Sequence, residues 1–337
     1  MPPSVRLSLV GATGAVGTQF LRVIDHLDLS FSSLDLIASK RSAGSTVTFR
    51  GRAHPVVAIE DYDFSKCDVS FFTAGSKVSG EYGPRAAAAG CIVVDNTSRF
   101  RLDEGIDLIV PQLNGSLVQR NRAGSIIANP NCSTIQIVKV LAPIRELFGV
   151  RDVVVSTYQA ASGAGQKAVD ELLAHTGSET PAPRSEYFRA PLAFNVVPVI
   201  DELYQSGWTK EELKIVHESR KIMQVPELRL TATAVRVPVV VGHSVAMFTR
   251  TERPVDVAAL LDSFARNREV VACPDDRIPT PRFIAERDKT YVGRIRVDPD
   301  DPRGLWTWIV ADNLWVGAAY NGGQIIQMLV EQHTGRA

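Results

Sequence analysis

The sequence predicts a two-domain α/β protein, in which a doubly wound, mostly parallel sheet is followed by a second domain rich in longer strands. Three observations lead to this prediction. A β-rich run at residues 5–10 passes through a glycine turn into a helical pattern. Short apolar runs and helical patterns then alternate up to residue 128, as a parallel sheet requires. From about residue 130 the pattern changes to longer elements, and 337 residues are enough for two domains.

Composition and charge narrow the class of protein. Hydrophobic residues make up 45% of the chain, enough for a full core, yet no apolar run reaches the ~20 residues that span a bilayer. Lysine plus arginine and aspartate plus glutamate number 37 each, so the net charge gives no indication of nucleic-acid binding. The start of the chain has no signal-peptide pattern, and the four scattered cysteines have no metal-binding spacing. We therefore expect a cytoplasmic protein with no metal site, membrane or nucleic-acid partner.

The glycine turn at residues 11–17 reads GATGAVG and lies between the first strand and a helix that continues to about residue 27. Its spacing, G-x-x-G-x-x-G, is a variant of the dinucleotide-binding fingerprint, whose glycines let the backbone approach a pyrophosphate at the helix N-terminus. The alternative is a purely structural turn, which this spacing alone does not exclude. The residues that we expect to contact a nucleotide are Gly11, Thr13, Gly14, Ala15, Val16 and Gly17.

The next predicted strand, at residues 34–39, ends in Ser39, Lys40, Arg41 and Ser42. An NAD site usually has a carboxylate here, to bind the ribose 2′-hydroxyl. Two cations and two hydroxyls suit a 2′-phosphate instead. The sequence therefore favours NADP over NAD, although a solvated basic loop would read the same way.

Further strands are predicted at residues 69–73, 92–94, 108–110 and 126–128, with a helix at 83–89. Ligands of such sheets bind at the carboxyl ends of the strands. Ala74, Gly75 and Asn96 follow strand ends, and Arg101 lies in a loop that faces the same edge.

Cys132 lies where the strand at residues 126–128 gives way to a helical pattern at 135–147. The free N–H groups and the helix dipole at such a point favour a thiolate, which is a nucleophile. Among the four cysteines, Cys132 alone has a setting that indicates chemistry.

The second half begins with a strand at residues 153–158 and a glycine-rich turn at 159–165, which suggests a close approach to a ligand or to Cys132. A helix at 166–175 and a loop or lid at 176–191 follow. Thr209 and Glu212 form a capping box that opens another helix. On that helix Glu218 and Lys221 share one face, and a surface ion pair is their ordinary interpretation.

The strand at residues 228–237 alternates strongly, and Arg236 falls on its apolar face. A cation that faces inward needs an anion. His243 follows at the start of the next strand, at 245–249; such a histidine is usually structural, but a thiolate elsewhere makes it a natural partner in proton transfer. Strands at 291–297 and 306–310, a surface loop at 266–282 and a terminal helix at 316–333 complete the chain.

Together these motifs resemble the aspartate-β-semialdehyde dehydrogenase family over nearly the whole chain. The resemblance rests on the glycine turn, on the segments VDNTS (94–98), NPNCST (129–134), TYQAASGAG (157–165) and ESRKI (218–222), and on RVP (236–238), GHS (242–244), VGRIR (292–296) and ADNL (311–314). It implies a Rossmann-type NADP-binding domain at residues 1–130 with the C-terminal helix at 314–337. It also implies a catalytic and dimerisation domain at 131–313, an α+β domain with a mixed sheet like that of glyceraldehyde-3-phosphate dehydrogenase.

The implied reaction is the reversible NADPH-dependent reduction of 4-phospho-L-aspartate to L-aspartate 4-semialdehyde and phosphate, in the biosynthesis of lysine, methionine, threonine and diaminopimelate. By resemblance, Cys132 forms a thioester, His243 moves protons and Gln159 orients the acyl group. Asn131, Arg101 and Lys221 would hold phosphate or substrate, Glu218 the substrate ammonium and Arg236 its carboxylate. Ser162, Gly163 and Asn313 would join the cofactor site, and a homodimer or tetramer would form through the second domain, near residues 166–175.

The chain departs from the family pattern at Gln112, at Trp315 and Val316, and at residues 321–323. The first two changes remove charge near the expected cofactor edge, but none of the three removes a proposed catalytic group. Alternatives are a related enzyme, such as N-acetyl-γ-glutamyl-phosphate reductase or malonyl-CoA reductase, and a silent nucleotide-binding paralogue. Glu218 and Arg236 favour an amino-acid substrate, and the retained Cys132 and His243 argue against a silent paralogue.

Overall fold

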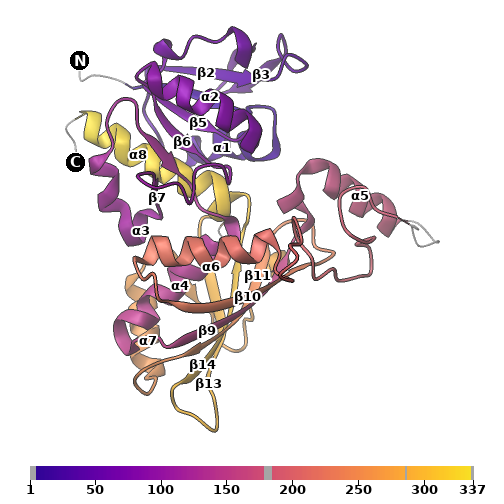
Figure 1. Ribbon diagram of the computed structural model, residues 1–337, viewed down its shortest axis with the longest axis vertical. Coiled ribbons are helices and arrows are strands. Elements are labelled where there is room, and N and C mark those ends of the chain that lie inside the picture. Colours follow the sequence, from indigo (N-terminus) through magenta and orange to yellow (C-terminus); the bar gives the residue numbers. More distant parts are fainter. Residues whose placement is uncertain (1–4, 178–183, 285–286, 335–337) are drawn as a thin grey trace. The chain divides into compact units, whose positions relative to one another are not determined.

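The chain forms two compact units in the computed structural model, which describes residues 5–177, 184–284 and 287–334 (Figure 1). Unit 1 comprises residues 1–131 and 318–337, and unit 2 comprises residues 132–317. The sequence-based division placed these boundaries after residues 130 and 313. The loop expected at 176–191 lies partly outside the described residues.

Unit 1 is built on an eight-stranded sheet in the order β3-β4-β2-β1-β5-β6-β8-β7. All neighbouring strands are parallel except β3 and β4, which form an antiparallel hairpin. The strands are β1 (Arg6–Val10), β2 (Ser33–Ala38), β3 (Thr46–Phe49), β4 (Arg52–Ala58), β5 (Val69–Phe72), β6 (Ile92–Asp95), β7 (Asp107–Leu108) and β8 (Ile126–Ala128). The helices are α1 (Ala15–His26), α2 (Ser76–Ala88), α3 (Pro111–Asn114) and α8 (Tyr320–Thr334). The predicted doubly wound sheet is confirmed.

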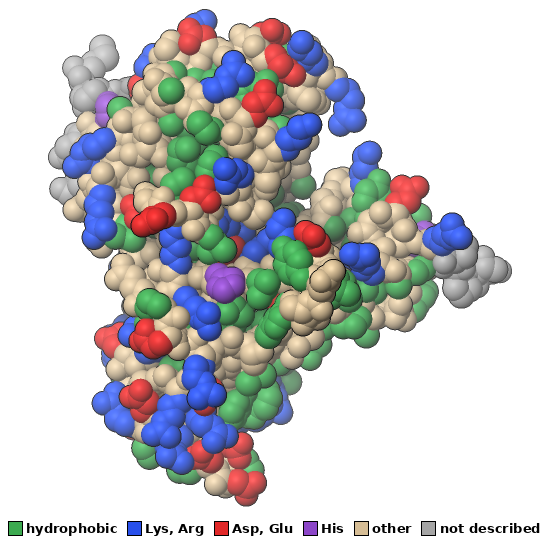
Figure 2. All heavy atoms as spheres, in the orientation of Figure 1, with side chains coloured by type: hydrophobic (Ala, Val, Ile, Leu, Met, Phe, Trp, Pro, Cys, Tyr) green, Lys and Arg blue, Asp and Glu red, His purple; other side chains and the backbone are tan. Residues whose placement is uncertain are grey.

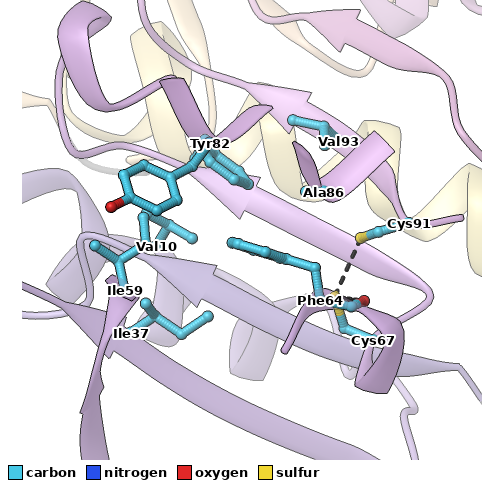
Figure 3. Packing of buried hydrophobic residues seen from close by; sticks show 10 residues of the cluster. Val10, Ile37, Ile59, Phe64, Cys67, Tyr82, Ala86, Cys91 and Val93 are labelled. Atoms are coloured by element: carbon cyan, nitrogen blue, oxygen red, sulfur yellow. Dashed lines mark hydrogen bonds between the residues drawn. The ribbon is translucent and has the colours of Figure 1, made fainter. Parts of the chain in front are cut away.

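The core of unit 1 lies where the strands meet α2. Figure 3 shows Val10 and Ile37, from neighbouring strands, packed near Phe64 and Tyr82. Because a parallel sheet is covered on both faces, its central strands are buried almost throughout, as β5 illustrates. The sulfur atoms of Cys67 and Cys91 lie 3.1 Å apart within this core.

Four elements of unit 1 differ from expectation. The hairpin β3–β4 was not predicted, because Pro55 interrupts β4 and the strand lacks clean alternation of polar and apolar residues. Helix α2 begins seven residues earlier than expected and contains Pro84. Strand β7 has only two residues, since Val110 already serves as N-cap of α3. A π-helical turn, Trp315–Ala319, precedes α8, which therefore begins later than expected.

Unit 2 contains a six-stranded mixed sheet in the order β10-β9-β11-β14-β13-β12. Its strands are β9 (Asp152–Gln159), β10 (Arg229–Arg236), β11 (His243–Arg250), β12 (Val270–Ala272), β13 (Thr290–Val297) and β14 (Gly304–Ala311). Its helices are α4 (Cys132–Phe148), α5 (Gln166–Thr176), α6 (Lys210–Met223) and α7 (Val257–Arg266). Strand β12 lies inside the segment 266–282, where a loop was expected; it pairs with only one neighbour.

Helices α4 and α6 pack against each other, and α6 also packs on β10 (Figure 1). The predicted capping box of α6 is present: Thr209 accepts from the backbone N–H of Glu212, whose side chain accepts from the backbone N–H of Thr209. No helix among the described residues is long and apolar enough to cross a membrane.

Candidate active site

Cys132 lies where β8 gives way to α4, as predicted, but it is already the first residue of this helix, which was expected to begin at residue 135. Its side chain is partly exposed, whereas most of the helix behind it is buried. Gly317, in the π-helical turn, lies directly against it. A Cβ atom built on Gly317 would stand 2.6 Å from Cβ of Cys132 and 3.0 Å from its Cα. Glycine is therefore required at this position for the turn to pack on Cys132.

His243 is completely buried at the start of β11. The backbone N–H of Ala160 donates to its Nδ1 over 3.0 Å, so the neutral ring carries its proton on Nε2. Nε2 is buried and has no partner among the described residues. Burial, reinforced by the charge of Arg236, lowers the pKa of His243 to about 3. At neutral pH the residue is therefore an uncharged donor whose N–H awaits an acceptor.

Arg236 ends β10 and pairs in register with Gln159 of β9. It faces inward, as predicted, and is 6% exposed. Burial lowers the pKa of its guanidinium, while the charges of Glu211 and Cys132 oppose that shift. Nη1 donates to the carbonyl oxygen of Ala160 over 2.7 Å, and this is the one side-chain hydrogen bond that the described residues provide. A buried guanidinium with so few acceptors fits an anionic ligand.

Gly163 lies between these two groups. A Cβ atom there would stand 2.8 Å from Nη1 of Arg236 and 3.2 Å from Nε2 of His243. The close approach expected of the turn 159–165 is thus to Arg236 and His243. The same measurement shows that the guanidinium and the imidazole share one small volume.

Asn313 and Ser162 hold the backbone beside His243. The Asn313 side chain accepts from the N–H of Gly242 over 2.8 Å and donates to the Ser162 hydroxyl over 3.0 Å. Both residues are buried. Unit 2 therefore brings Gln159, Ser162, Gly163, Arg236, His243 and Asn313 together.

Glu211 is a functional candidate that the sequence analysis missed. It is 5% exposed, and its Oε1 accepts from Nε2 of Gln159 over 3.0 Å. The available signal was its position seven residues before Glu218, on the buried face of α6. Glu218 is only 1% exposed, so it is no ordinary surface charge, while Lys221 is partly exposed. The phosphate and ammonium roles of Lys221 and Glu218 stay predictions.

The glycine turn of unit 1 has the geometry of a nucleotide cradle. Gly11 adopts φ +92°, and a Cβ atom on Gly17 would stand 2.2 Å from the carbonyl oxygen of Gly11. Gly14 is the N-cap of α1, which has no side-chain cap. Within the part of the chain that the structure describes, no side chain caps this helix end, which suits a pyrophosphate. Thr13, Ala15 and Val16 belong to the same segment.

The loop at residues 39–42, which is predicted to bind a 2′-phosphate, follows β2, and the carboxyl end of β2 meets the glycine turn. The Thr13 hydroxyl donates to that of Ser42 over 3.4 Å, which places the loop beside the turn. Ser39 and Arg41 are exposed, and Arg41 forms no ion pair or hydrogen bond with the described residues. No carboxylate follows β2 at this point.

Three asparagines link the strand ends of unit 1. Nδ2 of Asn129 donates to the side-chain oxygen of Asn96 over 2.6 Å, and Nδ2 of Asn321 donates to that of Asn129 over 2.6 Å. Arg101 donates to the backbone carbonyls of Asn129 and Asn96, each over 2.9 Å. Arg101 is thereby held in place at 7% exposure, and Asn131 is 5% exposed. Ala74 and Gly75 lead into α2, with Gly75 at φ +94°.

Two of the residues that depart from the family pattern, Gln112 and Trp315, contact other side chains. Gln112 donates to the Gln324 side chain over 2.9 Å. The ring of Trp315 stacks beneath the guanidinium of Arg287 at 4.8 Å, and Arg287 pairs with Asp312 over 2.7 Å. Arg287 therefore supplies a positive charge beside the π-helical turn. Within the described ranges, no group of three histidine, cysteine, aspartate or glutamate side chains could hold a metal ion.

Comparison with known proteins gives a consistent result over the whole chain. Residues 6–120 match the family model described as semialdehyde dehydrogenase, NAD binding domain. Residues 141–316 match the model described as semialdehyde dehydrogenase, dimerisation domain. A nicotinamide cofactor is thus supported, without distinction between NAD and NADP.

Individual relatives are similar along their full length. Aspartate-semialdehyde dehydrogenase of Legionella pneumophila is 44% identical, over 98% of this chain and 96% of its own. That of Bacillus subtilis is 39% identical, over 98% of both chains. The crystal structure of aspartate semialdehyde dehydrogenase II from Vibrio cholerae matches with a TM-score of 0.94 at 39% identity, covering 98% of this chain and 99% of that one. The same enzyme has also been solved in complex with ASA.

Proposed function

The chain belongs to the aspartate-semialdehyde dehydrogenase family, and from this premise we propose that it interconverts L-aspartate 4-semialdehyde and 4-phospho-L-aspartate with a nicotinamide cofactor and phosphate. The observation that carries the proposal is that the described residues give the buried Arg236 few acceptors and leave the neighbouring Nε2 of His243 without a partner. These two groups fit a substrate that carries a carboxylate close to a reacting carbonyl.

The cofactor would be held by the glycine turn and the N-terminus of α1, whose geometry fits a pyrophosphate. When bound, it supplies or accepts the hydride. We assign it as NADP, because Arg41 and the hydroxyls of Ser39 and Ser42 follow β2 where a carboxylate would select NAD. Ala74, Gly75 and Asn96 follow neighbouring strand ends and would line the same edge. Ser162, Gly163 and Asn313 are assigned to the nicotinamide by resemblance.

Cys132 is the nucleophile of the proposed reaction. In the direction of oxidation its thiolate adds to the aldehyde carbon, and the carbonyl oxygen becomes an alkoxide. His243 donates a hydrogen bond from its Nε2–H to this oxygen, where negative charge develops. Loss of hydride from the carbon then leaves a thioester on Cys132. Phosphate attacks the thioester carbon, and the thiolate is released as the acyl phosphate forms.

The proton on Nε2 sets the role of His243. Because Nδ1 accepts from Ala160, the resting imidazole is a donor toward the substrate. Acceptance of a proton by Nε2 requires the other tautomer, which loses the hydrogen bond from Ala160. We therefore propose that the proton stays at Nε2 while the alkoxide forms.

The remaining polar groups hold the substrate ends. Arg236 binds the α-carboxylate of the substrate through the guanidinium N–H groups that do not donate to Ala160. Glu218 binds the ammonium group, and Gln159 donates to the bound acyl group. Arg101, Lys221 and Asn131 are assigned to phosphate and substrate by resemblance.

The decisive assay is reduction of NADP by the purified protein with L-aspartate 4-semialdehyde, with and without inorganic phosphate. We expect turnover that requires phosphate and is abolished by a thiol alkylator and by Cys132→Ser. Unchanged turnover in Cys132→Ser would refute the covalent mechanism. Turnover with another acyl phosphate or acyl-CoA, but none with the aspartate compounds, would assign the alternative enzyme.

Self-association is proposed through the open face of the unit 2 sheet. This face presents Val154, Tyr158, Phe248, Trp306 and Trp308, in cross-strand register. The rings of Tyr158 and Trp308 lie 5.5 Å apart, and Val154 is 45% exposed. Figure 2 shows hydrophobic side chains gathered on the surface of this unit. We propose a homodimer, because an apolar sheet face of this kind is typical of a subunit interface; light scattering should give twice the mass of one chain.

A further inference from the structure

The side-chain amide of Gln159 has one orientation, and Glu211 determines it. A carboxylate only accepts hydrogen bonds, so the amide nitrogen of Gln159 must face Glu211, over 3.0 Å. The amide oxygen then accepts from the Thr157 hydroxyl over 3.0 Å. All three residues are at most 5% exposed. The second N–H of Gln159 is left without a partner among the described residues.

The Glu211 carboxylate is itself held from its other side. Its Oε2 accepts from Nζ of Lys214 over 3.1 Å, and the same ammonium donates to Asp201 over 2.7 Å. Because a lysine ammonium only donates hydrogen bonds, Lys214 holds Oε2 of Glu211 and leaves Oε1 to face Gln159. The result is a chain of contacts from Asp201 through Lys214 and Glu211 to Gln159.

Glu211 is also the carboxylate whose charge acts on Arg236 and His243, where it opposes the effect of burial on both. Helix-capping is not its task, because the neighbouring Glu212 performs that role. Glu212 additionally accepts from the backbone N–H of Ala234 in β10 over 3.0 Å. Two adjacent buried glutamates thus have separate partners: one secures the helix and the strand, the other the site.

We propose that Glu211 is a positioning residue of the reaction, which holds the Gln159 amide with its second N–H toward the acyl group on Cys132. This inference rests on the proposed function, since it requires an acyl group at that cysteine. It assigns Glu211 to catalysis through Gln159 and not to substrate affinity. Arg236 binds the carboxylate, and removal of a neighbouring negative charge does not weaken that contact.

The test is the variant Glu211→Gln. The ammonium of Lys214 only donates, so the amide oxygen of the new glutamine must face Lys214. The NH₂ group of the new glutamine then faces Gln159. Gln159 must turn its own oxygen to meet that donor, and its N–H no longer faces the acyl group. We expect kcat to fall by about 10- to 100-fold without a rise in KM. Gln159→Ala should cost a similar factor, and the double variant should be no slower than Gln159→Ala alone.

The matched control is Glu212→Gln, which should lower the unfolding midpoint and leave kcat within about 2-fold. If Glu211→Gln does not fold, Glu211→Asp tests the same contact, because it keeps the charge and withdraws the carboxylate by one methylene; kcat should again fall at unchanged KM. Wild-type kcat in a folded Glu211 variant, a raised KM, or losses that multiply with those of Gln159→Ala would overturn the inference. An inactive wild-type protein would instead refute the proposed function.

Discussion

The backbone N–H of Ala160 donates to Nδ1 of His243 at 3.0 Å and leaves the proton of the neutral ring on Nε2. The contact joins the turn after β9 to the first residue of β11. An imidazolium would have to present an Nδ1–H to this N–H, which agrees with a pKa lowered to about 3 by burial and by Arg236.

His243 should therefore make stability depend on pH. Its pKa in the folded state is about 3, below the ordinary value of about 6.5 expected in the unfolded state. Between these values the unfolded state binds the proton and the folded state does not. The free energy of unfolding therefore falls as pH falls from about 6 to 4.5, by about 1.4 kcal/mol per pH unit from this residue. Chemical denaturation of the wild type and His243→Asn should show this difference in slope; parallel curves would contradict the assignment.

Arg236→Lys should weaken substrate binding although the charge is kept. The lysine ammonium cannot match a carboxylate with two parallel N–H donors. We expect kcat/KM for the semialdehyde to fall roughly 30-fold, or about 2 kcal/mol. The matched control is Arg229→Lys at the exposed start of the same strand, where an ion pair with Asp152 has little energetic weight. Equal kinetics of the two variants would argue against a carboxylate at Arg236.

Gly163→Ala should disturb the site more than the fold. The added methyl group would meet Nη1 of Arg236 at 2.8 Å and Nε2 of His243 at 3.2 Å. Both groups must shift, and we expect kcat/KM to drop on the order of 100-fold. Gly177→Ala is the control, because its nearest contact is an ordinary 3.7 Å. The prediction fails if the two alanine variants have the same kcat/KM.

Arg41→Ala should lower kcat/KM for NADPH about 10- to 30-fold and leave that for NADH unchanged, because a charge-assisted contact to the 2′-phosphate is lost. Arg52→Ala, at the start of β4 and hence at the opposite edge of the parallel sheet, should change neither value. A preference of the wild type for NADH would contradict the NADP assignment.

Much of this site is visible in the sequence because its signals are local. The turn before Cys132 lies between a short apolar run and a long helical pattern, and Arg236 interrupts a period-two strand. Neither observation needs knowledge of distant residues. The capping box at Thr209 is equally local, since it depends on a spacing of three.

What could not be predicted depends on packing between distant segments. Glu211 lies in the first turn of a helix, where an acidic residue is ordinarily explained by the helix dipole. Only the pairing of β9 and β10 and the packing of α6 on β10 bring it to Gln159, 52 positions earlier. In the same way, the sequence indicated that Gly163 approaches something closely, but its neighbours are set by two other strands.

The contact between Cys132 and Gly317 has a topological consequence, because these are the first and last residues of unit 2. Unit 2 is an insertion whose two ends touch. The flanking ends of unit 1 are equally close, since Nδ2 of Asn129 donates to the carbonyl of Ala318 over 3.2 Å. Excision of unit 2 thus leaves a gap that a linker of a few residues can close, as domain insertions generally allow. The nucleotide-binding module can in this way be engineered as a continuous chain, with Cys132 removed along with the insert.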